Sequence, residues 1–195
     1  RFDAMILPYD YMFDERGNLT TRLLRERLLR KDAGFRWTYP IHEILHTEGK
    51  RVGIYDGVRI SHRKHTRLNV NQRRNLEVLK AKGDPTSPRT LFYLGVEHAT
   101  VREYQEAARN FEEYIKVASN EDESYQALVM LGEIQRVFGR WEIAIEFYQK
   151  AVIVRPDWRD AYIGLSVLFA QREDWGRAAH YGEEARKKSP VMQTS

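Results

Sequence analysis

The chain has 195 residues, with 32 Lys and Arg against 28 Asp and Glu, and it contains no cysteine. Its 42% hydrophobic content is typical of a folded protein, and the missing cysteine excludes disulfides, thiolate metal sites and cysteine nucleophiles. No apolar run reaches the ~18 residues of a membrane span, and no secretory leader opens the sequence. We therefore expect a cytoplasmic protein.

Charge divides the chain into two parts. Residues 1–87 hold 18 basic and 11 acidic side chains, a net charge of +7, whereas residues 88–195 hold 14 and 17, a net charge of −3. A basic segment suits phosphate in a nucleotide, a nucleic acid or a membrane surface. A solvated basic surface explains the charge equally well, so the asymmetry predicts only two segments with different tasks.

The first part is expected to form short strands and then a helix. In chain order we predict a strand over 4–13 interrupted by Pro8, a turn over 14–18, a strand or helix over 21–30, an alternating run over 34–46 that becomes helical after Pro40, a strand over 52–60 bent at Gly53 and Gly57, and a helix over 71–82. These pieces give a small core for 87 residues.

The second part is a repeat. Leu94-Gly95, Leu131-Gly132 and Leu165-Ser166 align, and three further columns follow in step: Ala107, Ala144 and Ala178; Phe111, Tyr148 and Gly182; Tyr114, Ala151 and Ala185. The second and third units are 34 residues apart and the first and second 37, the extra residues falling in the polar stretch 119–124. Turns are predicted at Gly139-Arg140-Trp141 and Asp174-Trp175-Gly176.

These columns resemble the tetratricopeptide repeat, a helix-turn-helix unit of 34 residues. The resemblance implies an all-α solenoid of three repeats over residues 88–190, followed by a tail over 191–195. Small side chains in the Gly and Ala columns would let neighbouring helices approach closely. The helix over 175–188 is polar along much of its length, which suits a terminal cap facing water.

Such arrays usually bind a protein or peptide on the face lined by the first helix of each repeat. The matching column here holds Phe92, Val129 and Ile163, an apolar stripe rather than a row suited to clamping a carboxylate. Two interpretations stay open: a groove for an apolar segment of a partner, or a face that is simply packed.

Four short segments of the first part carry a second resemblance. Arg22–Arg30 is rich in arginine, Phe35–Leu45 contains Trp37 followed by Ile41-His42-Glu43, Val58–His62 ends in Ile-x-His, and Arg73–Leu76 contains Arg-Asn. In this order they resemble the C-terminal part of bacterial family-2 glycosyltransferases, some of which continue into tetratricopeptide repeats.

This resemblance implies an α+β chain whose residues 1–68 are part of a Rossmann-like glycosyltransferase domain of the GT-A type, joined by a helix and linker over 69–87 to the repeats. The family transfers sugar from a nucleotide-sugar donor with inversion, and Mn²⁺ or Mg²⁺ is held by an Asp-x-Asp motif. The sequence has no Asp-x-Asp. We therefore expect Arg1 to mark the edge of a longer enzyme and this chain alone to be inactive, with no tightly bound metal.

The resemblance also assigns site residues. Glu43 would be the base that deprotonates the acceptor, and His62 a metal or diphosphate ligand. The candidate phosphate neighbours are Arg25, Arg27, Arg36, Arg63 and Lys64. Without the resemblance, His42 is a hydrogen-bonded core residue and the segment from His62 to Lys64 is a solvated basic loop.

Three functions follow from the sequence. The first is a glycosyltransferase segment whose repeats recruit the acceptor or a partner, or hold two subunits together. The alternative is a non-catalytic interaction module with a basic capping segment. A nucleic-acid binder using the basic residues of 59–74 ranks last, because no nucleic-acid motif accompanies the charge.

We predict that the chain binds a uridine-diphosphate sugar with Mn²⁺ weakly or not at all, because the diphosphate-binding motif is absent. Isothermal calorimetry tests this, and micromolar binding would contradict it. In an enzyme that also carries a donor-binding half, Glu43→Gln should abolish transfer and leave donor binding intact. Surviving activity would exclude Glu43 as the base.

Overall fold

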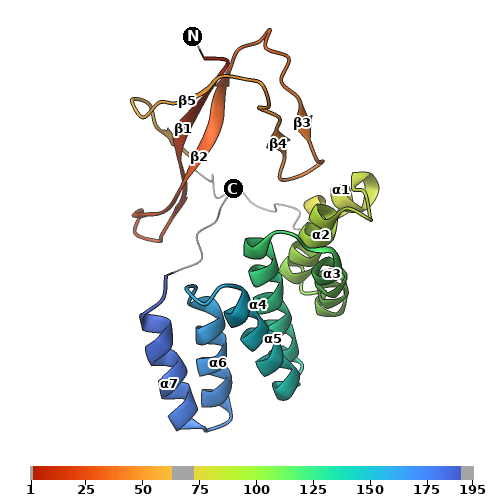
Figure 1. Ribbon diagram of the computed structural model, residues 1–195, viewed down its shortest axis with the longest axis vertical. Coiled ribbons are helices and arrows are strands. Elements are labelled where there is room, and N and C mark those ends of the chain that lie inside the picture. Colours follow the sequence, from red (N-terminus) through yellow and green to blue (C-terminus); the bar gives the residue numbers. More distant parts are fainter. Residues whose placement is uncertain (1, 63–72, 190–195) are drawn as a thin grey trace. The chain divides into compact units, whose positions relative to one another are not determined.

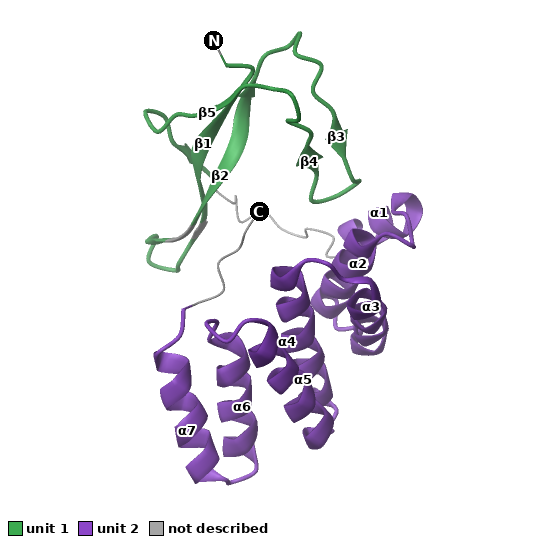
Figure 2. Ribbon diagram, in the orientation of Figure 1, with its two compact units in different colours: residues 1–70, 195 green, residues 71–194 purple. Residues whose placement is uncertain are grey.

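The computed structural model describes residues 2–62 and 73–189 (Figure 1). It divides into two compact units, residues 1–70 with residue 195, and residues 71–194 (Figure 2). Each unit is described by itself. The candidates Arg63 and Lys64, like the expected tail 191–195, lie outside the described residues.

Unit 1 is built on one long hairpin. Strand β1 (Ala4–Phe13) pairs antiparallel with β2 (Leu19–Leu29), and two short strands, β5 (Val52–Ile54) and β6 (Ile60–Ser61), pair parallel with the other edge of β1. A second sheet contains β3 (Trp37–Thr38) and β4 (Ile44–Leu45). The described part of unit 1 contains no helix. The strands that we expected are present, but the Rossmann-like architecture is not supported.

The first strand continues through Pro8 instead of stopping there. The carbonyls of Ile6 and Asp10 accept hydrogen bonds from the backbone N–H groups of Tyr55 and His62, so the even-numbered residues of β1 point their backbone groups toward β5 and β6. Pro8 lies between the segments of β1 that pair with β5 and with β6. At this position neither short strand needs a hydrogen bond from a backbone N–H, which proline lacks. The single strand expected over 52–60 is instead two short strands, β5 and β6, which pair with the same edge of β1.

The prediction of a helix after Pro40 is wrong. The segment forms the β3–β4 hairpin, in which Tyr39 and His42 have positive φ values of 69° and 49°. Pro40 disfavours helical backbone in the residue before it, and the left-handed residue after it ends the turn. His42 and His46 therefore do not share a helix face.

Unit 1 has a small apolar core, made of Ala4, Leu7, Ala33, Ile41 and Leu45. Asp3 joins its strands electrostatically: its carboxylate pairs with Arg30 at 2.9 Å and accepts a 2.9 Å hydrogen bond from the backbone N–H of Arg51. The hydrogen bond from Arg51, aided by the charge of Arg30, lowers the pKa of Asp3. A charged tie thus substitutes for some of the missing apolar contact.

Unit 2 is helical. A short helix, α1 (Arg74–Lys82), buries Leu76 and Leu79 as predicted. Three helix pairs follow: α2 (Pro88–Thr100) with α3 (Tyr104–Val117), α4 (Glu121–Val137) with α5 (Trp141–Val154), and α6 (Asp160–Gln171) with α7 (Trp175–Arg186). The three predicted repeats are present. No helix in the described ranges is long and apolar enough to span a membrane.

Glycines let an aromatic ring interlock the repeats. A Cβ on Gly132 would come within 2.6 Å of the Tyr148 ring, and one on Gly164, in the next repeat, within 2.4 Å of the same ring. Gly95 leaves the same space for Phe111 in the first repeat. In the third repeat both positions are small, because Ser166 of α6 faces Gly182 of α7. In the first two repeats, a glycine on the first helix thus makes room for an aromatic ring on the second helix.

The turns within the repeats each use one left-handed residue. These are Arg102, Gly139 and Glu173, with φ values of 63°, 71° and 59°. Only the second is the glycine that this conformation favours. The third turn lies slightly earlier in the chain than predicted, because Trp175 and Gly176 already belong to α7. Asp174 caps that helix: its side chain accepts a hydrogen bond from the backbone N–H of Arg177.

Gly164→Ala should destabilise unit 2 by about 1–3 kcal/mol, because the added methyl overpacks against the buried Tyr148 ring. Gly176→Ala is the matched control: its Cβ would meet nothing closer than 3.8 Å, and alanine favours helix, so it should be neutral or stabilising. Thermal unfolding followed by circular dichroism measures both. Equal melting temperatures for the two variants would contradict the interlock.

Candidate functional site

The first helices of the repeats line a hollow of unit 2 that is about 740 Å³ in volume. Helices α2 and α4 supply most of its lining, with Tyr104 from α3 and Asp160 from the start of α6. Its apolar lining includes Phe92, Val96, Val129, Met130, Ile134 and Val137. Its volume lies in the range of ligand pockets in proteins.

The predicted apolar stripe is only partly brought together here. Phe92 and Val129 line this hollow, although Phe92 is 4% exposed and packs on Phe111 and Tyr114 in the core. Ile163 lies elsewhere: it is 44% exposed and lines a smaller hollow of about 260 Å³ between α6 and α7. Phe92 therefore forms the floor of the hollow and does not project into it.

Glu133, one of two carboxylates in the lining, is fully engaged within the repeats. Its oxygens accept hydrogen bonds from the Tyr148 hydroxyl at 2.6 Å and from Arg136 at 2.6 Å. Burial, together with the hydrogen bond to Glu133, raises the pKa of Tyr148. This carboxylate thus fixes the interlocking tyrosine and is neutralised by Arg136.

Asp160, the other carboxylate, is not neutralised in this way. Its Oδ2 atom is buried, and within the described residues no hydrogen-bond donor reaches that atom. Nearby, the Tyr125 ring is fully buried, and its hydroxyl accepts a 2.9 Å hydrogen bond from the Ala161 N–H. Burial raises the pKa of Tyr125 to about 12, and the charge of Asp160 adds to the shift.

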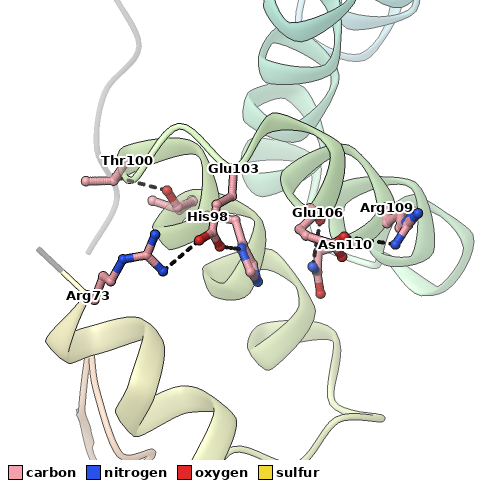
Figure 3. A network of polar contacts seen from close by, with 8 residues as sticks. Arg73, His98, Thr100, Glu103, Glu106, Arg109 and Asn110 are labelled. Carbon is pink, nitrogen blue, oxygen red and sulfur yellow. Dashed lines mark hydrogen bonds and ion pairs between the residues drawn. The ribbon is translucent and has the colours of Figure 1, made fainter.

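A polar network joins α1 to the first repeat (Figure 3). Glu103, in the α2–α3 turn, pairs with Arg73 at 2.6 Å and with the Nδ1 atom of His98 at 2.7 Å. His98 is 4% exposed, and Asn75 of α1 donates to Glu97 at 3.1 Å. No sequence pattern indicated a role for His98, because its partner Glu103 comes from the turn and the cation Arg73 from outside the repeat. The network holds α1 in place.

Two of the predicted site residues of unit 1 meet on one face of the sheet. The Tyr9 hydroxyl lies 2.5 Å from the Nδ1 atom of His62, and the Arg27 guanidinium stacks on the Tyr9 ring with its central carbon 4.5 Å from the ring centroid. Arg25 pairs with Leu7 in the strand register and so lies on the same face as Arg27. Tyr9, which the sequence did not single out, is the centre of this cluster.

The other candidates do not join this cluster in any described contact. Glu43 is exposed in the turn of the β3–β4 hairpin, and Arg36 is exposed just before β3. Among the described residues, no three His, Asp or Glu side chains are placed to hold a metal ion. The described residues therefore do not fit a Mn²⁺ or Mg²⁺ site.

Comparison with known proteins agrees with the helical part. A family model described as the tetratricopeptide repeat matches residues 94–161 and 139–192, which together span half of the chain. The chain belongs to the tetratricopeptide repeat family.

Relatives within that family match the repeats over part of their length. The photosystem I assembly protein Ycf3 of Synechococcus sp. (strain CC9605) is 32% identical over 82 residues, 42% of this chain and 46% of the relative. A crystal structure of MamA is 25% identical with a TM-score of 0.51, covering 57% of this chain and 64% of that one. A second MamA structure, 24% identical with a TM-score of 0.52, shows the same fold. The chain thus spans less than two thirds of each.

The Glu103 network predicts a pH dependence. The hydrogen bonds from Arg73 and then His98 lower the pKa of Glu103 from its ordinary value of 4.5. The ionised form therefore stabilises the fold above pH 4.5, and this stabilisation is lost as the pH falls through the lowered pKa. Glu103→Gln should melt at a lower temperature than the unchanged protein at pH 7, and the difference should shrink below pH 4.5. A difference that is constant with pH would exclude the charge as the cause.

Proposed function

We propose that the chain is a protein-interaction module in which the groove of unit 2 binds a segment of a partner protein. The observation that carries the proposal is the apolar hollow on helices α2 and α4, which no described segment of unit 2 fills. Tetratricopeptide arrays present such a face to partners. The Ycf3 relative is a photosystem I assembly protein, which supports a role in bringing proteins together.

The groove has the composition expected of such a site. Apolar side chains form its floor, whereas Thr100, Gln126, Glu133 and Asp160 provide polar groups around it. Val137 is 55% exposed, so an apolar side chain of the partner can cover it without any rearrangement of the core. Burial of such surface would drive binding.

A peptide selection tests this function. Phage-displayed random 16-residue peptides are selected on the full chain, and their affinities are measured by fluorescence anisotropy. Val137→Glu should weaken selected peptides about tenfold or more, because it places a charge on the apolar lining. Ile153→Glu is the control, since Ile153 is 79% exposed on α5 and lies outside the groove. Peptides that bind both variants equally would exclude the groove as the site.

A second function is proposed for unit 1, supported by the meeting of Arg27 and His62 at Tyr9. Basic side chains on one sheet face suit the diphosphate of a nucleotide-sugar, in line with the resemblance to family-2 glycosyltransferases. In that case the sheet unit acts as part of a longer enzyme, with Mn²⁺ or Mg²⁺ held by residues outside this chain. Loss of transfer in the Glu43→Gln enzyme is the test.

A further inference from the structure

We infer that the groove of unit 2 selects a partner segment in which large apolar side chains stand beside a lysine or arginine, whose cation pairs with Asp160. The inference rests on the proposed function and adds the chemistry of the partner. It commits to a segment of another protein chain as the occupant.

The first support is the state of the Asp160 carboxylate. This residue begins α6 and lines the same hollow as the apolar floor. Its Oδ2 atom is buried without a hydrogen-bond donor, and no side chain of the described residues forms an ion pair with it. Because that oxygen is closed to solvent, a ligand cation in the hollow would gain from the unpaired negative charge of the carboxylate and not from a hydrogen bond to Oδ2.

Asp160 lies in the first turn of a twelve-residue helix, and this end of a helix favours a negative group. Its charge is also felt by Tyr125, whose pKa it helps to raise. A negative group at one side of an apolar hollow attracts a cation rather than a neutral donor.

The cations of the repeats are engaged elsewhere. Arg136 is bound to Glu133, and Arg155 pairs with Asp122 at 3.2 Å while stacking on Trp158 at 4.5 Å. Arg159, the neighbour of Asp160, lines the smaller hollow on the other side of α6. The described lining of the groove contains no Lys, Arg or His. Within unit 2, Asp160 therefore faces the hollow without a cation of its own lining.

The rest of the groove indicates a peptide as the carrier of this cation. The hollow of about 740 Å³ accommodates more than one apolar side chain. Gln126 of α4 lines it as well, and its amide can donate to a peptide carbonyl and accept from a peptide N–H. An extended segment offers both groups at each residue.

The test uses peptides selected on the full chain from the random library. Selected sequences should be enriched in Lys or Arg beside apolar residues. Asp160→Asn should weaken them about tenfold, whereas replacing the basic residue of the peptide by Gln should weaken binding to the unchanged protein but not to Asp160→Asn. Glu146→Gln, which neutralises an exposed carboxylate on α5, is the matched control and should leave affinity unchanged.

Several results would overturn the inference. Apolar peptides without basic residues, or equal affinity for Asp160→Asn, would show a groove that binds peptides by other chemistry, and the proposed function would stand. A concentration-dependent dimer abolished by Asp160→Asn would make a second copy the occupant. Failure to select any groove-binding peptide would count against the proposed function itself. If Asp160→Asn unfolds by circular dichroism, the Gln-substituted peptides on the unchanged protein still decide.

Discussion

The helical unit depends on one contact, the Tyr148 ring held between Gly132 of its own repeat and Gly164 of the next. The ring fits only because both glycines lack a Cβ, so the second and third repeats can stack this closely only with glycine at these two positions. Glu133 of α4 accepts a hydrogen bond from the Tyr148 hydroxyl and so fixes the orientation of the ring. Because Glu133 also lines the groove, the contact that stacks the repeats reaches the binding surface itself.

The groove is consequently a product of the stacking and not of any one helix. Its floor uses core residues such as Phe92, which pack on the second helix of the first repeat. Its polar groups come from all three repeats, with Thr100 in the first, Glu133 in the second and Asp160 in the third. A partner that contacts both Phe92 and Asp160 would bind the first and third repeats at once. Its affinity would therefore depend on how the repeats are stacked.

The two units gain stability by different means. Unit 2 buries aromatic rings in continuous clusters between helices. Unit 1 buries few apolar side chains, exposes large ones such as Leu28 and Ile54, and relies on charged ties such as Asp3 with Arg30. Asp3 is only 9% exposed, so this ion pair is partly shielded from solvent and supplements a core that is small for the length of the unit. The repeats therefore have the larger apolar core of the two units.

The sequence by itself determined the three repeats, the small-residue columns and the strand of residues 4–13, because spacing and residue size act locally or between repeats of fixed length. It could not place the hairpin after Pro40, nor the left-handed turns at Arg102 and Glu173, since no glycine marks these positions. Only the tertiary structure separated Ile163 from Phe92 and Val129, and only it left the Asp160 oxygen buried and unpaired. Both depend on which side chains meet across repeats, and a single column of residues does not contain that information.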